Sequence, residues 1–301
     1  MATVWPVVLL LRFVDRVGKG LRGAPRDALL TEVTDPTLRG RAFGLHRAMD
    51  HAGAMLGPLL AAGLLALPGV ELRDLFVWTL VPGLAVIAVL VWGVREPERP
   101  ATAGGEQAGR APRLVANAER AFAWRSPLGR LVLACGLFGL GNSSDAFLLL
   151  RLSDIGFSAA AVALLWSAHN LIKLVGTSFG GVLADRWGRR PLVVGGWIAF
   201  ALTYLAMGLA PSPAWSVAAF LVYGLASGGA EPAEKAWVAD LAPIGARGEA
   251  FGWYHGVTGL AALPASLLFG LVWESVGAEA AFAVGAGLAL AAAASLARVR
   301  E

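Results

Sequence analysis

The amino-acid sequence predicts an all-α membrane protein with nine transmembrane helices, three in a partial first bundle and six in a second. Hydrophobic residues make up 57% of the 301-residue chain and charged residues only 15%, whereas charged residues make up about 25% of an ordinary soluble domain. Apolar windows of about 20 residues, each long enough to cross about 30 Å of hydrocarbon, recur along almost the whole chain. Residues 39–44 (RGRAFG) also return as residues 247–252 (RGEAFG), 208 positions later, which indicates that a helix pair is duplicated.

Each predicted span is an apolar run that ends at charged residues or at a turn rich in Pro and Gly. Only the opening third of the first span is uniformly apolar, whereas the others are apolar over most of their length. The spans are placed at residues 2–33, 40–66, 74–94, 127–150, 157–184, 190–209, 213–241, 248–273 and 276–297.

Basic residues mark one set of connections as cytoplasmic, because Lys and Arg are retained on that side of a bilayer. They gather at residues 39–41, 95–125, 186–190, 247 and 298–300. Residues 95–126, rich in Pro, Gly, Ala and Arg, are expected to form a cytoplasmic linker between a partial bundle (residues 1–94) and a six-helix bundle (residues 127–301). The net charge of +4 then reflects basic loops facing anionic lipid, and nucleic acid is not an expected partner.

The duplication also predicts which part of the first copy this chain lacks. Residues 127–208, projected back by 208 positions, fall before Met1. We therefore expect the first three helices of a twelve-helix arrangement to be absent. Residues 12–66 should superpose on residues 220–273 about a pseudo-twofold axis normal to the membrane.

A charged loop, GVLADRWGRR, joins two apolar spans at residues 181–190. Its acid, Asp185, can face the positive N-terminal end of a neighbouring helix, which we expect to be the one that opens near Arg247. Arg189 can reach Asp240. Such contacts would hold the cytoplasmic side closed in one state of the protein. The residues assigned to this gate are Gly181, Asp185, Arg186, Gly188, Arg189, Arg190, Asp240 and Arg247.

A second motif, Gly53, Gly57 and Pro58, lies in the second span, where small residues spaced four apart let helices approach closely and a proline lets a helix bend. The loop, this glycine–proline motif and Arg12, 20 residues before Glu32, together resemble the major facilitator superfamily, in particular its proton-coupled drug antiporters. The resemblance covers helices four to twelve of that family. It implies a transporter in which two bundles rock about a central site near the bilayer midplane.

The first predicted helix carries an unusual set of charges at membrane depth. At 100° per residue they fall within roughly 140° of arc, so they share one face. Because a charge at mid-bilayer costs about 2.5–3.5 kcal/mol, this face should line a cavity or meet opposite charge. We expect it to meet Glu231 and Glu234 of the pseudo-equivalent helix, which also carries Lys235. The set is Arg12, Asp15, Arg16, Lys19, Arg22, Arg26 and Asp27.

These charges have two interpretations, a binding site for substrate and protons or a structural cluster of ion pairs. Further candidates for the same site are Asp50, Asp145, His169 and Lys173, since polar groups at membrane depth are usually functional or paired. Asp50 could instead be satisfied by Arg47 one turn earlier.

The sequence predicts a transporter of the cell membrane that moves a small molecule by alternating access, most directly by proton-coupled export through the lipid bilayer. Uptake of an organic anion is an alternative, because the basic residues at positions 12, 16, 19 and 22 could bind a carboxylate or phosphate. A non-transporting remnant, or a truncated gene model, is another. Enzymatic function is not expected: Ser227 lacks the glycine two places earlier that intramembrane serine proteases carry, since Leu225 stands there. No cofactor and no metal ligand set is predicted.

Overall fold

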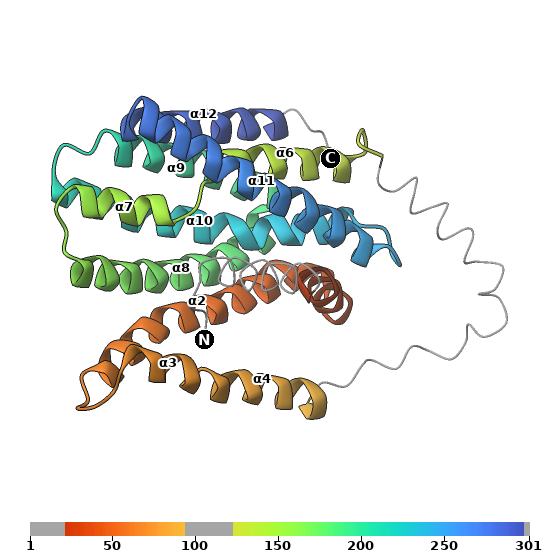
Figure 1. The fold of residues 1–301 in the computed structure, drawn as a ribbon. Coiled ribbons are helices and arrows are strands. Elements are labelled where there is room, and N and C mark those ends of the chain that lie inside the picture. Colours follow the sequence, from red (N-terminus) through yellow and green to blue (C-terminus); the bar gives the residue numbers. More distant parts are fainter. Residues whose placement is uncertain (1–21, 94–122, 298–301) are drawn as a thin grey trace.

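The computed structural model describes residues 22–93 and 123–297, and within these ranges the chain forms helices and no strand (Figure 1). A first helical segment, residues 22–33, lies ahead of the short 3-10 helix η1 (Pro36–Leu38). The helices that follow are α2 (Arg39–Leu65), α3 (Leu72–Trp78), α4 (Leu80–Gly93), α6 (Pro127–Gly141), α7 (Ala146–Asp154), α8 (Ala159–Trp187), α9 (Arg189–Gly208), α10 (Pro213–Leu241), α11 (Arg247–Ser275) and α12 (Ala278–Ala297).

Seven segments of the described chain are long and apolar enough to cross a membrane, and they include α3 joined to α4 and α6 joined to α7. Helix α10, with 29 residues, is as long as α8 and α11 but carries Glu231, Glu234, Lys235 and Asp240 in its second half. Most of the first predicted span and most of the linker lie outside the described residues. The chain is therefore an all-α, multi-pass membrane protein.

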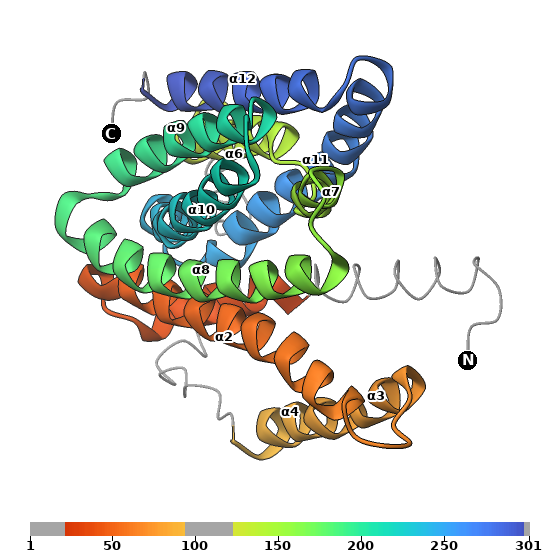
Figure 2. The ribbon, with the colours of Figure 1, turned by 90° about the vertical axis from the view of Figure 1, so that its left-hand side faces the viewer.

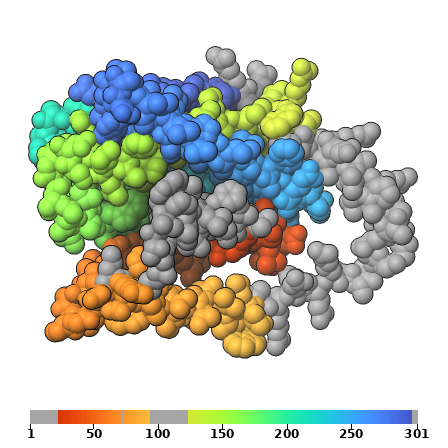
Figure 3. Space-filling view, in the orientation of Figure 1, coloured from red at the N-terminus to blue at the C-terminus, as the bar shows by residue number. Residues whose placement is uncertain are grey.

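Helix α10 lies inside the bundle, with α8, α9 and α11 around it (Figure 2). Its second half is largely buried, including Ala233, Ala236 and Ala239, and these small side chains let the neighbouring helices approach. Helices α3 and α4, in contrast, form an outer edge of the molecule (Figure 3), and their large apolar side chains are mostly exposed, as expected for a surface in contact with lipid. The acids of α10 are thus held in the centre of the bundle.

The span predicted as one helix at residues 127–150 is interrupted. Helix α6 ends at Gly141, and α7 begins at Ala146. Between them, the hydroxyl of Ser143 lies 3.3 Å from that of Tyr204, and the Ser144 hydroxyl accepts a hydrogen bond from the backbone N–H of Ala146. Side chains that bond the local backbone compete with a helix, so the polar run at residues 142–145 breaks it and turns Asp145 toward the interior.

Helices α2 and α8 cross where glycines replace side chains. A Cβ added to Gly44 would lie 2.6 Å from the carbonyl oxygen of Thr177. A Cβ added to Gly40 would lie still closer to the carbonyl oxygen of Gly181. The prediction that Gly53 and Gly57 mediate close packing was wrong for the described residues, because an added Cβ would meet nothing within 4 Å at either position. Gly53 and Gly57 follow Gly44 along α2, and Figure 2 shows that the later part of α2 diverges from α8.

This difference gives a direct test of the crossing. Gly44→Ala should lower the thermal unfolding midpoint of the purified protein, because backbone atoms of α8 would have to move away from the new methyl group. Gly53→Ala, on the same helix but facing open space, should leave the midpoint unchanged or raise it slightly, since alanine is the better helix former. Equal losses in the two variants would show that α2 does not cross α8 at Gly44.

Candidate functional site

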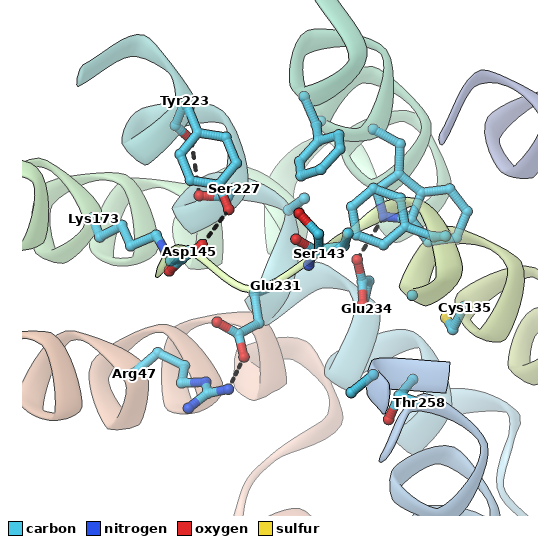
Figure 4. Close-up of a pocket in the computed structure, with 18 of the residues that line it drawn as sticks. Arg47, Cys135, Ser143, Asp145, Lys173, Tyr223, Ser227, Glu231, Glu234 and Thr258 are labelled. Atoms are coloured by element: carbon cyan, nitrogen blue, oxygen red, sulfur yellow. Dashed lines mark hydrogen bonds and ion pairs between the residues drawn. The ribbon is translucent and has the colours of Figure 1, made fainter. Parts of the chain in front are cut away.

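A cavity of about 590 Å³ lies within the bundle, between α2 on one side and α6, α8, α9, α10 and α11 on the others. Figure 4 shows Asp145 and Lys173 at one side of this cavity and Glu234 at the other, with Glu231 between them, above Arg47. The lining residues are Arg47, Cys135, Phe138, Gly139, Asn142, Ser143, Asp145, Lys173, Gly196, Trp197, Phe200, Tyr223, Ser227, Ala230, Glu231, Glu234, Tyr254, Thr258 and Ala262.

Two of the lining acids have basic partners. One carboxylate oxygen of Asp145 lies 3.2 Å from Nζ of Lys173, and the other accepts a 2.7 Å hydrogen bond from the hydroxyl of Tyr223. Glu231 of α10 pairs with Arg47 of α2, which also bonds Asp50 one turn later at 3.0 Å. Asp145 and Lys173, both predicted for the site, are therefore brought together in its wall.

Glu234 is held differently. Its carboxylate accepts a 2.6 Å hydrogen bond from the indole nitrogen of Trp197 and a 3.1 Å hydrogen bond from the hydroxyl of Tyr254. Only 8% of the residue is exposed, and no ion pair to it occurs among the described residues. Because its hydrogen-bond partners are neutral, this buried carboxylate has no opposite charge in contact with it among the described residues, so it can accept a proton or a cation.

The pairing predicted between the first helix and these acids was wrong for the described part of that helix. Arg26 bonds the adjacent Asp27 at 2.9 Å, and Arg22 is exposed. The contact between the helices has the opposite polarity: Lys235 of α10 lies 3.1 Å from Asp27. One position along α10 separates Lys235 from Glu234, and this rotation directs the base, rather than the acid, toward the first helix. Arg12, Asp15, Arg16 and Lys19 lie outside the described residues.

Asp27 forms the most buried ionic cluster of the described residues. It has no exposed surface, and its second oxygen accepts a bond from Nε2 of His255 on α11 at 2.9 Å in addition to Lys235. Lys235 is itself 1% exposed. The cluster joins three helices from widely separated parts of the sequence, and it does not line the cavity.

Two further predicted site residues, His169 and Asp50, do not line the cavity. The ring of His169 stacks on Phe220, 4.3 Å between centroids, and its Nδ1 lies 3.0 Å from the carbonyl oxygen of the same residue. Asp50 is exposed on α2 and pairs with Arg47. Both belong to the surroundings of the cavity rather than to its wall.

The charged loop makes a second site, at the predicted cytoplasmic ends of the helices. The two oxygens of Asp185 accept hydrogen bonds from the backbone N–H groups of Gly40 at 2.8 Å and Arg41 at 3.0 Å, which are the first residues of α2. Asp185 thus caps a helix N-terminus, as predicted, but the helix is the one that opens at Arg39 and not the one at Arg247. The duplication supplies two equivalent N-termini; α2 packs on α8, whereas α11 packs on α6 and α12.

The predicted contact between Arg189 and Asp240 is present, with 3.0 Å between Nε and the carboxylate. Arg189 also bonds Asp185 at 2.5 Å. Arg39, which sequence reasoning did not assign to the gate, donates to the other oxygen of Asp240 at 2.7 Å. These four side chains connect α2 with α8, α9 and α10.

The other residues assigned to the gate have lesser parts. Gly188 has a φ of +92°, and this left-handed geometry lets α8 end and α9 begin within one residue. Arg186 is exposed, with no ion pair to another described residue. Arg190 lies half-buried in the first turn of α9, and Arg247 lies half-buried at the start of α11, away from Asp185.

Some functional residues could have been found from the duplication. Arg47 and His255 are 208 positions apart, the repeat distance, and each is a base that crosses to an acid on another helix. The same rule relates Arg39 to Arg247. Trp197 and Tyr254, the donors to Glu234, had no such signal, because a Trp or Tyr inside an apolar span reads as core.

Comparisons with known proteins identify the family of the chain. The family model of the Major Facilitator Superfamily matches residues 1–152 and residues 131–301. An uncharacterized MFS-type transporter of Methanocaldococcus jannaschii is 28% identical over 95% of this chain and 70% of its own length. The tetracenomycin C resistance and export protein of Streptomyces glaucescens is 30% identical, but over only 46% of this chain and 26% of its own.

Among solved structures, the human organic anion transporter MFSD10 superposes with a TM-score of 0.73 at 19% identity, over 91% of this chain and 67% of that one. The likeness at this identity shows the fold. The chain spans about two thirds of the length of the proteins that it matches over most of its own sequence. With both parts of the described chain matched by one family model, this protein is a member of the Major Facilitator Superfamily.

Proposed function

We propose that this protein exports a small molecule across the cell membrane in exchange for protons, by alternating access. The observation that carries the proposal is Glu234, a buried carboxylate in the wall of a central cavity, without a basic partner among the described residues. A carboxylate of this kind can hold a proton in one state and a substrate in another.

The cytoplasmic contact supports the alternating part of the proposal. Asp185, Arg189, Asp240 and Arg39 join α2 to the helices of the second bundle, and the cavity lies deeper, at residues 223–234 of α10. Breaking these bonds would let the bundles separate on this side and open the cavity to the cytoplasm. The bundles are residues 1–94 and 127–301, with residues 95–126 linking them.

Export is favoured by the similarity of 46% of the chain to a protein named for tetracenomycin C resistance and export. That similarity concerns a short part of that protein, so the substrate is not transferred with it. The alternative of anion uptake depends on the basic residues at positions 12, 16, 19 and 22.

Inside-out membrane vesicles test the coupling. Vesicles that contain the full chain are energised to acidify their lumen, and uptake of ethidium and of tetracenomycin C is measured. We expect uptake that stops when nigericin and valinomycin collapse the proton gradient, since each substrate entering must displace a proton. Vesicles prepared without the protein are the control. Uptake that continues at the same rate after the collapse would contradict proton coupling. If neither compound is taken up, export of compounds like ethidium or tetracenomycin C is contradicted.

A further inference from the structure

The charges in the cavity wall indicate which ligand it can hold. Among the described lining residues the acids are Asp145, Glu231 and Glu234, and the bases are Arg47 and Lys173. Asp145 is matched by Lys173 at 3.2 Å, and Glu231 is matched by Arg47. Among the lining residues that the structure describes, one carboxylate, Glu234, is therefore in excess.

The nearest base along the chain does not neutralise Glu234. Lys235 is directed toward the first helical segment, where Nζ lies 3.1 Å from Asp27. Trp197 and Tyr254 each donate one hydrogen bond to Glu234, but neither carries positive charge. Burial of an unpaired charge is costly, so a cation or a proton at this position would be stabilised.

The wall beside Glu234 is aromatic. The ring of Phe138 lies flat on Trp197, with 4.6 Å between centroids and 5° between the planes. Phe200 contacts the ring of Phe138 edge-on, with 4.9 Å between centroids. Tyr254 completes this part of the lining, whereas Tyr223 lies at the other side, where its hydroxyl bonds Asp145. Aromatic faces attract cations as well as apolar groups, whereas an anion here would meet the negative charge of Glu234.

From this arrangement we infer that the substrate is an organic cation with an aromatic body, which binds with its charge at Glu234 and its rings against Phe138. The inference rests on the proposed function and names its substrate class. A proton and the cation then compete for one carboxylate: the cation leaves when Glu234 is protonated and binds when it is deprotonated. One positive charge replaces the other, so the charge on the carboxylate is balanced in both states.

Equilibrium binding to the purified full chain tests the site without requiring transport. Ethidium, a flat aromatic cation, is titrated against the protein in detergent and followed by fluorescence anisotropy. Glu234→Gln should weaken ethidium binding by about tenfold or more, since it removes a charge-assisted contact but keeps an acceptor oxygen for Trp197 or Tyr254. Glu234→Asp should retain binding better than Glu234→Gln, and Glu274→Gln, at an exposed acid near the end of α11, should bind as the unmodified protein does.

The same titration shows whether protons compete. The titratable and charged groups around Glu234 are Tyr254 of α11, Cys135 of α6, Lys235 of α10 and Arg47 of α2. Ethidium should bind more tightly as pH rises from 5 to 8, and this dependence should be lost in Glu234→Gln. The anion 8-anilinonaphthalene-1-sulfonate should show no loss of affinity in that variant.

Equal ethidium affinity in the unmodified protein and in a folded Glu234→Gln variant would overturn the inference. So would a comparable loss of the anion's affinity, because an aromatic site without charge preference would then be sufficient. The proposed coupling fails separately: if vesicle uptake survives collapse of the proton gradient while ethidium binding still depends on Glu234, the cation site stands and the exchange with protons does not.

Discussion

Replacing Lys235 by methionine is expected to lower the free energy of unfolding by about 3–5 kcal/mol, the cost of leaving one member of a buried ion pair alone. Lys235 is 1% exposed, and its partner Asp27 is fully buried. Methionine fills a similar volume, so the loss would come from the charge on Asp27 and not from a cavity. His255 and Arg26 still contact Asp27 and should prevent a larger loss.

The double variant Lys235→Met/Asp27→Asn distinguishes the interaction between the two residues from the contacts that each makes with its surroundings. Removing both charges should recover part of the stability lost by Lys235→Met alone, since the remaining amide is neutral. Stability is measured by SDS titration of the purified protein with tryptophan fluorescence as the signal. Arg73→Met, at an exposed base in α3, is the matched control and should change little. Strictly additive losses would show that Lys235 and Asp27 act independently.

The general architecture could be predicted from the sequence because it depends on features that extend over many residues, so that a few residues change them little. Apolar windows of spanning length place the helices, and a repeat at 208 positions relates α2 to α11. The contact between Arg189 and Asp240 was also predictable, because both residues lie at the ends of adjacent spans, where an acid and a base on the same side of the membrane have few other partners.

The rotation of each helix about its axis was not predictable in the same way. Glu234 and Lys235 are neighbours in sequence, yet one faces the cavity and the other faces Asp27. To decide which of the two faces the cavity, the rotation of α10 about its axis must be predicted with an error smaller than 100°, the angle between adjacent residues of a helix. The same limit explains Gly53 and Gly57: glycine spacing identifies a face that permits close packing, but not whether another helix crosses at that height.

The duplication identified two equivalent helix starts but did not show which of them contacts Asp185. It relates Arg39 to Arg247 as equivalent helix starts, and either could in principle receive Asp185. The choice depends on which of α2 and α11 lies against α8, a property of the assembled bundle that neither copy of the repeat contains. The broken helix at residues 142–145 was missed for a different reason, since an apolar window averages over four polar residues.

Asp185→Asn is expected to shift the protein toward a state open to the cytoplasm and to slow transport, with little loss of protein from the membrane. The carboxylate accepts two backbone bonds from α2 and a third from Arg189. An amide has one acceptor oxygen and no charge, so it cannot satisfy all three donors. Loss of charge-assisted bonds worth about 1.5–3 kcal/mol would change the ratio of the two states by about tenfold to a hundredfold.

The chain carries its own reporter for this change. Cys135 is the single cysteine, it is 1% exposed, and it lines the cavity. In inside-out vesicles, a membrane-impermeant maleimide should label it faster in Asp185→Asn and in Arg189→Ala than in the unmodified protein. Arg186→Ala, in the same loop but at an exposed side chain, should label at the unmodified rate. Bonds that hold two bundles together must alter access to the cavity when they are removed. If all of these proteins were labelled at one rate and moved substrate at one rate, the loop would therefore fix only the orientation of the chain.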